Sequence, residues 1–370
     1  MIDSKLFAKI ILMVVIPFTF VALVIPFIKK IAVQIGAVDM PGGRHIHKKP
    51  TPKLGGLGIF LGYLLGYMIF GTPSSQMNSI LIGSFIILIT GIIDDIVELK
   101  PSIKFAGQLM AALVIAIYGG ILLKDVSAFG IYLDFGIMSY PLTIFFILGC
   151  VNCINLIDGL DGLSGGISSI YYLTIGIIAT MQGKHGLDFV LAFVMLGSTL
   201  GFLVHNFNPA KIFAGDSGSN FMGFIIAVIA LLGFKNVTFL GLMISVIMLL
   251  GLKTVTLTSL LIPAVLLVLP IMDTLFAIIR RFLKGESISK GDSYHIHHQL
   301  LRRNLSVKQT VLIIYLVDIL FASASIIYIL KDKYLGYIIY GILLALVIVF
   351  VINTNVIYDF KDSSKEKKHE

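Results

Sequence analysis

A short polar stretch from Asn152 to Gly166 ends a long apolar run and combines two amides with two carboxylates. Asn152 and Asn155 are three residues apart, and so are Asp158 and Asp161, so a helical continuation would stack each pair on one face. Charge at the end of a membrane-length apolar run is costly unless it has a task. A polar loop between two helices also accounts for this composition, because loops commonly carry such residues.

Two adjacent carboxylates, Asp94 and Asp95, follow another apolar run, and Lys100 and Lys104 come soon after them. Neighbouring carboxylates repel each other, so a metal ion, a lysine or a shared proton must relieve the repulsion. A helix cap would account for one of the two aspartates but not for both. We therefore expect the pair to belong to a functional site.

Asp216 has glycines on both sides and is followed by hydroxyl side chains, in the order Gly215, Asp216, Ser217, Gly218 and Ser219. In this setting it can present a bare carboxylate to Mg²⁺, while the free N–H groups of the next helix face an anion. The alternative is an N-cap aspartate that opens that helix.

Two further segments supply basic side chains. The first, residues 39–56, mixes them with proline and glycine, which suits phosphate binding and equally suits anchoring at lipid headgroups. The second, residues 284–308, has three histidines in four residues, but no cysteine or second cluster lies nearby to complete a zinc site. On a helix two of these histidines share a face with an arginine, which favours an anion-binding strip. The candidate residues are His47, Lys48, Lys49, His295, His297, His298 and Arg302.

Carboxylates, amides, lysines, histidines and a candidate Mg²⁺ ligand together form an inventory typical of phosphoryl transfer, where catalysis is mostly positioning and charge neutralisation. Cys150 and Cys153 form a C-x-x-C pair. Since the sequence shows no partners for a redox or metal role, we expect them to be buried thiols.

Composition identifies the elements that must position these groups. The chain has 370 residues, of which 57% are hydrophobic and only 13% charged. No soluble fold of this size buries so much apolar surface, which indicates a polytopic membrane protein. The net charge of +8 does not indicate nucleic-acid binding, because the basic residues flank apolar spans and form no patch interleaved with aromatics.

Apolar runs of helical length predict an all-α polytopic integral membrane protein with about 11 transmembrane helices and cytoplasmic active-site loops. A first helix that is retained, and not a cleaved signal peptide, is expected at the N-terminus. The segment 126–135 predicts a small surface hairpin. The runs lie near residues 6–28, 54–71, 79–93, 105–123, 137–153, 165–181, 187–206, 218–234, 237–251, 255–280, 310–330 and 334–353.

Alternation of these spans places all the polar segments on one side of the membrane. Most of the 28 Lys and Arg residues fall on that side, which the positive-inside rule makes cytoplasmic. Parity requires an even number of crossings between Asp216 and the basic loop near residue 281, yet three apolar runs lie there. Residues 231–241 recur as residues 249–259, so either a local duplication adds a re-entrant or interfacial segment, or the boundaries differ.

The motifs resemble those of the polyprenyl-phosphate N-acetylhexosamine-1-phosphate transferases. They read H-K-K-P-T-P-K-L-G-G, G-I-I-D-D, N-C-I-N-L-I-D-G-L-D-G-L, N-P-A-K-I-F-A-G-D-S-G-S and H-I-H-H, in family order from about residue 39 to 303. The resemblance implies transfer of a sugar phosphate from a UDP-sugar to a polyprenyl phosphate, release of UMP, and a requirement for Mg²⁺ or Mn²⁺. The wording of the third motif and of H-I-H-H favours the branch that uses UDP-N-acetylglucosamine and undecaprenyl phosphate to start teichoic acid, O-antigen or a similar polymer.

The resemblance also implies roles for single residues. Asp94 and Asp95 would bind or deprotonate the lipid phosphate, and Asp216 would be the main metal ligand, joined by Asp95 and Asn155. Lys104 would contact the diphosphate.

Further residues would line the substrate sites of such an enzyme. Asn155, Asp158 and Asp161 would lie along the nucleotide. The first-loop residues His47, Lys48 and Lys49 would bind substrate, and the loop with His295, His297, His298 and Arg302 would close over the sugar diphosphate.

The same resemblance implies one transmembrane transferase domain, residues 1–354, with a charged cytoplasmic tail, residues 355–370, in the bacterial inner membrane. It implies contact with membrane lipid and no nucleic acid, and family members often form homodimers. One alternative is the branch that takes the muramoyl pentapeptide of peptidoglycan. Another is a secondary transporter with acids such as Asp273 and Asp318 on an ion path, but transporters place their sites near the midplane between repeated halves.

Overall fold

The computed structural model describes residues 3–41, 50–128, 131–183, 185–233, 300–301, 303–330 and 333–352. This part of the chain is almost wholly helical, and eight of its helices are long and apolar enough to cross a membrane, as in a polytopic membrane protein. The span near 237–280, where the parity problem arises, lies outside the described residues, as does Asp273.

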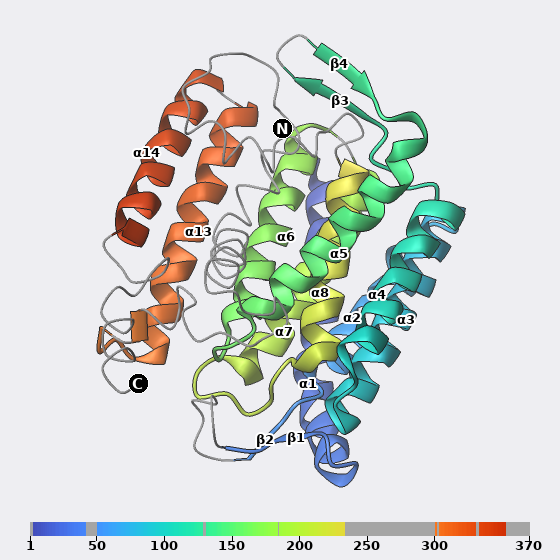
Figure 1. Ribbon diagram of the computed structural model, residues 1–370, viewed down its shortest axis with the longest axis vertical. Coiled ribbons are helices and arrows are strands. Elements are labelled where there is room, and N and C mark those ends of the chain that lie inside the picture. Colours follow the sequence, from blue (N-terminus) through green and yellow to red (C-terminus); the bar gives the residue numbers. More distant parts are fainter. Residues whose placement is uncertain are drawn as a thin grey trace, which may run out of the picture.

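Helices α1 to α8 run back and forth as one bundle, with α13 and α14 beside it (Figure 1). The bounds are α1 Ser4–Gln34, α2 Gly55–Phe70, α3 Ser75–Val97, α4 Pro101–Leu113 with a wider turn at Val114–Tyr118, α5 Ser139–Ile157, α6 Leu163–Met181, α7 Leu187–Asn206, α8 Gly215–Gly233, α13 Val307–Leu330 and α14 Lys333–Ile352.

Two small antiparallel pairs of strands lie at opposite ends of the bundle (Figure 1). Strand β1 (Val38–Asp39) pairs with β2 (Thr51–Pro52), and β3 (Asp125–Ala128) pairs with β4 (Ile131–Asp134). The second pair confirms the predicted hairpin. The first pair closes the base of the first basic loop.

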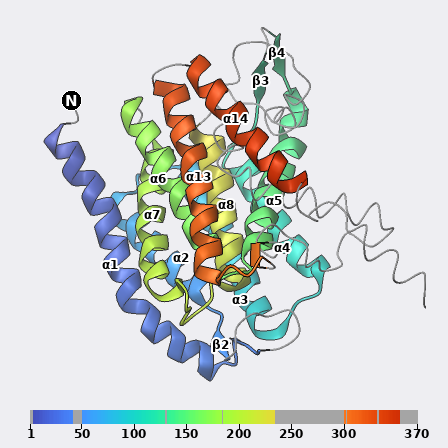
Figure 2. The same ribbon diagram turned by 90° about the vertical axis from the view of Figure 1, so that its left-hand side faces the viewer.

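Helix α8 is the core of the bundle. It packs against α3, α5, α2, α7 and α6, and all of its residues from Ser217 to Leu231 are buried. A helix that is apolar all round is one that other helices surround. In contrast, α1 lies along one edge against α7 and α2 (Figure 2), with large side chains such as Leu23 and Phe27 exposed. The residues at the start of α8 are therefore positioned by the helices that pack around it.

Glycines let two neighbours approach the start of α8 at backbone distance. A Cβ atom at Gly91 of α3 would lie 2.3 Å from the Cα of Ser217, and one at Gly56 of α2 would lie 2.2 Å from the nitrogen of Gly218. Small residues at such crossings are what allows close helix packing in lipid. The first turn of α8 is thus held between α2 and α3.

A proline in α1 leaves a carbonyl that α7 satisfies. Pro26 has no N–H, so the carbonyl of Ala22, four residues earlier, loses its intrahelical donor. The Nε2 of His205 lies 2.9 Å from this oxygen. Because a carbonyl can only accept, Nε2 carries the proton and donates it.

Candidate active site

The described polar candidates come together where helices end and begin at one end of the bundle, the lower end in Figure 1. Helix α3 ends at Val97, Glu98 adopts a left-handed conformation with φ of 47°, and α4 restarts at Pro101 in its first turn. Proline is favoured at this position because its missing N–H has no partner there anyway. This tight reversal brings Lys104 of α4 back over the last turn of α3.

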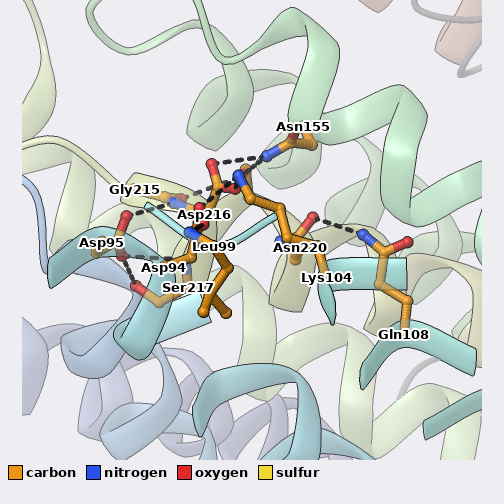
Figure 3. A network of polar contacts seen from close by, with 11 residues as sticks. Asp94, Asp95, Leu99, Lys104, Gln108, Asn155, Gly215, Asp216, Ser217 and Asn220 are labelled. Atoms are coloured by element: carbon orange, nitrogen blue, oxygen red, sulfur yellow. Dashed lines mark hydrogen bonds and ion pairs between the residues drawn. The ribbon is translucent and has the colours of Figure 1, made fainter. Parts of the chain in front are cut away.

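Lys104 bridges two carboxylates that are far apart in the sequence. Its Nζ lies 2.6 Å from Oδ2 of Asp94 and 2.9 Å from Oδ2 of Asp216, as Figure 3 shows. The other oxygen of Asp94 accepts a hydrogen bond from the backbone nitrogen of Leu99 at 2.7 Å. Exposure of the Asp94 side chain is 7%, against 28% for Asp216 and 34% for Lys104. An incoming ligand can therefore reach Asp216 and Lys104 more readily than Asp94.

Asn155, in the last turn of α5, completes the group. Its Nδ2 donates to Oδ1 of Asp216 at 3.1 Å and to the hydroxyl of Ser219 at 2.9 Å. Both oxygens of Asp216 are thus oriented by side chains from other helices. The structure brings Asp94, Lys104, Asn155 and Asp216 together.

Asp95 faces a different way from Asp94 (Figure 3). Its carboxylate accepts hydrogen bonds from the backbone nitrogen of Asp216 at 2.9 Å, and from the backbone nitrogen and hydroxyl of Ser217 at 3.2 and 2.7 Å. Asp95 is 3% exposed. Its role as a metal ligand stays a prediction, and its two oxygens are already engaged by α8.

Amide side chains form a second layer one helical turn further into the bundle. Gln108 donates to Asn220 at 3.5 Å and accepts from Asn152 at 3.0 Å. Each lies three or four residues from a member of the first group, on the same face of its helix. This layer ties α4, α5 and α8 together beneath the site.

The loop between α5 and α6 departs from the helical stacking expected of its aspartates. Helix α5 ends at Ile157, so Asp158 and Asp161 do not share a helix face, and that part of the prediction is wrong. Asp158 accepts a hydrogen bond from Ser164. Asp161 accepts from the side chain of Asn208 at 2.8 Å and from the backbone nitrogen of Ala210 at 2.9 Å.

Hydrogen bonds to the peptide groups of Gly162 hold the same loop in place. The nitrogen of Gly162 donates to the side chain of Asn206, and its carbonyl accepts from the hydroxyl of Tyr315 on α13. Burial raises the pKa of Asp158 to about 8, although the hydrogen bond from Ser164 acts in the opposite direction. Hence Asp158 is mostly protonated at neutral pH.

The remaining predicted site residues, namely His47, Lys48, Lys49, His295, His297, His298 and Arg302, lie outside the described residues. The base of the first basic loop is nevertheless placed. Lys53 pairs with Phe213, and the nitrogens of Gly55 and Gly56 donate to the carbonyls of Phe213 and Ala214 at 2.9 Å. This loop therefore ends beside the segment that leads into α8.

Comparison with known proteins identifies the family. The sequence model of glycosyl transferase family 4 matches residues 77–234, from α3 to α8. A probable undecaprenyl-phosphate N-acetylglucosaminyl 1-phosphate transferase of Bacillus subtilis is 39% identical over 333 residues, which cover 88% of this chain and 87% of the relative. The chain belongs to the polyprenyl-phosphate N-acetylhexosamine-1-phosphate transferase family.

Other members of this transferase family are also similar along most of their length. A decaprenyl-phosphate N-acetylglucosaminephosphotransferase of Mycolicibacterium smegmatis is 34% identical over 323 residues, covering 82% of this chain and 78% of the relative. An undecaprenyl-phosphate alpha-N-acetylglucosaminyl 1-phosphate transferase of Escherichia coli K12 is 26% identical over 317 residues, covering 84% and 81%.

The donor atoms of this transferase fit a hard divalent cation. Mg²⁺ and Mn²⁺ prefer carboxylate and carbonyl oxygens, and Mg²⁺ keeps water or substrate phosphate among its ligands. The oxygens of Asp94 and Asp216 already converge on one cation, the ammonium of Lys104. Within the described ranges, no three acidic, histidine or cysteine side chains are grouped so as to hold a metal alone.

Sequence reasoning missed several residues of the candidate site. Gln108 and Asn220 follow Lys104 and Asp216 by four residues, so helical spacing could have found them. The contact of Tyr315 with Gly162 spans 153 residues and leaves no local signal. Cys150 and Cys153 are free thiols as expected, but only Cys150 is buried, and Cys153 is half-buried.

Proposed function

We propose that this protein transfers N-acetylglucosamine 1-phosphate from UDP-N-acetylglucosamine to undecaprenyl phosphate, giving undecaprenyl-diphosphate-N-acetylglucosamine and UMP. The observation that carries the proposal is Lys104 held between Asp94 and Asp216 where α3, α4 and α8 meet. A fixed cation among carboxylates suits a reaction in which negative charge must be gathered and neutralised. The names of the relatives support the donor sugar and the polyprenyl acceptor.

In the proposed reaction an oxygen of the lipid phosphate attacks the phosphorus that bears the sugar, and the bond from this phosphorus to UMP breaks. Lys104 neutralises charge on the diphosphate, and Asp94 holds the lipid phosphate or takes its proton. Asp216, with Asp94 and Asn155, would hold Mg²⁺ or Mn²⁺, which when bound supplies further charge neutralisation. A covalent sugar-phosphate adduct on Asp94, if trapped, would replace direct transfer by two steps.

Asp158 and Asp161 belong to the nucleotide side of the proposed site, because their loop adjoins Asn155. A protonated Asp158 adds no negative charge next to a diphosphate. The basic residues His47, Lys48 and Lys49 and the loop with His295, His297, His298 and Arg302 complete the proposed substrate sites.

We further propose that the site end faces the cytoplasm across a bacterial inner membrane and that about 11 helices span it. Near the site end lie Lys29 and Lys30 within α1, Lys53 before α2, and Lys100 between α3 and α4, as the positive-inside rule expects of a cytoplasmic end. The product would begin a cell-envelope glycopolymer, and the protein would act in contact with lipid, as a monomer or homodimer.

The test uses protein purified in detergent with undecaprenyl phosphate, Mg²⁺ and UDP-N-acetylglucosamine labelled in the sugar. We expect label to enter the organic phase with equimolar UMP, and Asp94→Asn and Asp216→Asn each to lower kcat by about 10³-fold. Asp134→Asn is the matched control, because Asp134 is exposed at the opposite end of the bundle. Transfer only from the muramoyl-pentapeptide nucleotide would contradict the donor, and no transfer from any nucleotide sugar would contradict the function.

A further inference from the structure

The central helix α8 begins without a cap of its own. Ala214 and Gly215, the residues at its start, have no side-chain acceptor, and Gly215 has a φ of +72°. The first N–H groups of a helix have no intrahelical partner and usually receive one from a Ser, Thr, Asp or Asn side chain just before it. Something else must satisfy these groups, because Ser217 in the first turn of α8 is buried, with Gly56 of α2 and Gly91 of α3 at backbone distance from this turn.

The acceptor comes from α3. The carboxylate of Asp95 receives the N–H groups of Asp216 and Ser217 and the hydroxyl of Ser217. A Cβ atom at Gly215 would lie 2.5 Å from Asp95, so glycine is needed where the carboxylate approaches. A negative charge at a helix N-terminus is also favoured by the helix dipole. Asp95 thus does from another helix what a local cap residue normally does.

The two adjacent aspartates are consequently divided between two tasks. Consecutive residues of an α-helix point about 100° apart, so Asp94 and Asp95 reach different partners. Asp94 faces Lys104 and the turn at Leu99. Both aspartates are buried, at 5% and 3% exposure. They differ in their partners, because Asp94 pairs with the half-exposed Lys104, whereas the three hydrogen bonds of Asp95 all come from α8.

We propose that Asp95 is a positioning residue. It holds the backbone of Asp216 and Ser217, and thereby sets the direction in which the Asp216 carboxylate meets Lys104 and Asn155. It neither ligates the metal nor moves a proton. The inference rests on the proposed function, because that function gives Asp216 its role in metal binding. The hydrogen bonds between α8 and Asp95 do not depend on the reaction.

The experiment compares neighbouring variants, Asp95→Asn and Asp94→Asn. An Asn retains one carbonyl oxygen to cap α8, as Asn does at ordinary N-caps. We expect Asp95→Asn to lower kcat about tenfold, to change KM for the sugar nucleotide less than twofold, and to keep the acidic limb of the pH profile of kcat/KM. Asp94→Asn should lose about 10³-fold. A merely structural role would lower the folded fraction and leave turnover per folded molecule unchanged.

Binding of Mn²⁺, followed by electron paramagnetic resonance, tests the proposal without turnover. We expect Asp95→Asn to bind Mn²⁺ within about threefold of the wild type, and Asp216→Asn to lose binding. Loss of Mn²⁺ binding in folded Asp95→Asn, or loss of the acidic limb, would overturn the positioning role. These two readouts would show that the positioning role of Asp95 is wrong. A failure of the proposed function would instead appear as no transfer by the wild type.

Ser217→Ala provides a second variant in case Asp95→Asn does not fold. It removes one of the three hydrogen bonds to Asp95 and leaves the charge in place. On our proposal kcat falls about threefold and the acidic limb stays where it is. If Asp95 were the base, loss of this hydrogen bond would displace the limb, and that result would overturn the proposal.

Discussion

At the scale of single residues, the carboxylates of the site differ in what compensates their charge. Asp94 and Asp216 share the ammonium of Lys104. Asp158 has the hydroxyl of Ser164, and burial followed by the nearby charges of Asp216 and Asp95 raises its pKa to about 8. The pKa of an unfolded Asp is about 3.9. Asp158 is therefore a group whose protonation depends on folding.

The raised pKa of Asp158 predicts a pH dependence of stability. Since the folded state binds this proton more tightly than the unfolded state, the free energy of unfolding falls as pH rises from about 4 to about 8, and the contribution is fully lost above the folded pKa. In detergent, we expect the unfolding temperature of the wild type to drop between pH 6 and 9 relative to Asp158→Asn. Parallel curves for the two proteins would contradict the assignment.

Which polar residues come together was predictable where polarity stands out against an apolar background. Asp94, Lys104, Asn155 and Asp216 stand out in this way in the sequence, and the structure places them within contact of one another. The division of labour between Asp94 and Asp95 was not predictable, because it depends on a contact with α8 across 121 residues. Sequence reasoning held that a cap explains only one of the pair, without a means to tell which.

At the scale of elements, backbone contact between helices decides where the site residues sit. Gly91 lies one turn before Asp95 on α3 and directly opposite Ser217. If α3 stood further from α8, Asp95 would not reach the N–H groups that it caps. Glycine in a helix normally lowers stability by about 1 kcal/mol relative to alanine, so its presence here reflects the need for contact.

This contact predicts opposite outcomes for two helical glycines. Gly91→Ala would place a Cβ 2.3 Å from the Cα of Ser217, whereas a Cβ at Gly149 of α5 meets nothing within 4 Å. We expect Gly91→Ala to lower the unfolding temperature and to reduce transfer about 10²-fold. Gly149→Ala, the matched control, should leave transfer unchanged and stability equal or higher. Equal behaviour of the two variants would argue against the close approach.

The bond between His205 and the proline-interrupted helix α1 makes a second prediction at this scale. Loss of the donor in His205→Ala leaves the carbonyl of Ala22 unsatisfied, at a cost of about 1–3 kcal/mol. In a Pro26→Ala background, residue 26 regains an N–H for that carbonyl, so the same substitution should cost less. Thermal unfolding of the two single variants and the double variant measures the difference. Additive effects would mean that His205 does not serve the proline break.

At the scale of the whole molecule, sequence and structure agree on a helical bundle in which the described polar segments of the candidate site lie at one end. The apolar runs before residue 234 each correspond to a helix, because long apolar periodicity is a strong signal. The predicted ends of these helices were less accurate. Helix α5 continues to Ile157, past the predicted end near 153, so Asn155 lies on the helix together with Asn152. The packing order around α8 has no local signature at all.

Asp318 illustrates a polar residue whose setting the sequence could not give. It is an acid that a transporter would place on an ion path, and it is 1% exposed within α13. Neither of its oxygens has a hydrogen-bond partner among the described residues. Tyr315, one turn earlier on the same helix, does connect α13 to the site, through Gly162.

The orientation of the bundle is testable with single cysteines. Thr72 and Lys100 are exposed just outside the two ends of α3. With a membrane-impermeant maleimide, we expect Lys100→Cys to react in inverted vesicles and Thr72→Cys in intact spheroplasts. The wild type, whose cysteines are buried or half-buried, is the control for background labelling. The reverse pattern would place the site on the outer side.

The dependence of the site on α8 has a consequence for biogenesis. Asp95 is synthesised 121 residues before the backbone group that it caps, a delay of roughly 6–24 s at about 5–20 residues per second. Lys104 follows within the next helix and can neutralise Asp94 early, but Asp95 has no partner until α8 enters the membrane. During this interval the nascent chain exposes an uncompensated carboxylate at the membrane surface, where the insertion machinery or its chaperones must tolerate it.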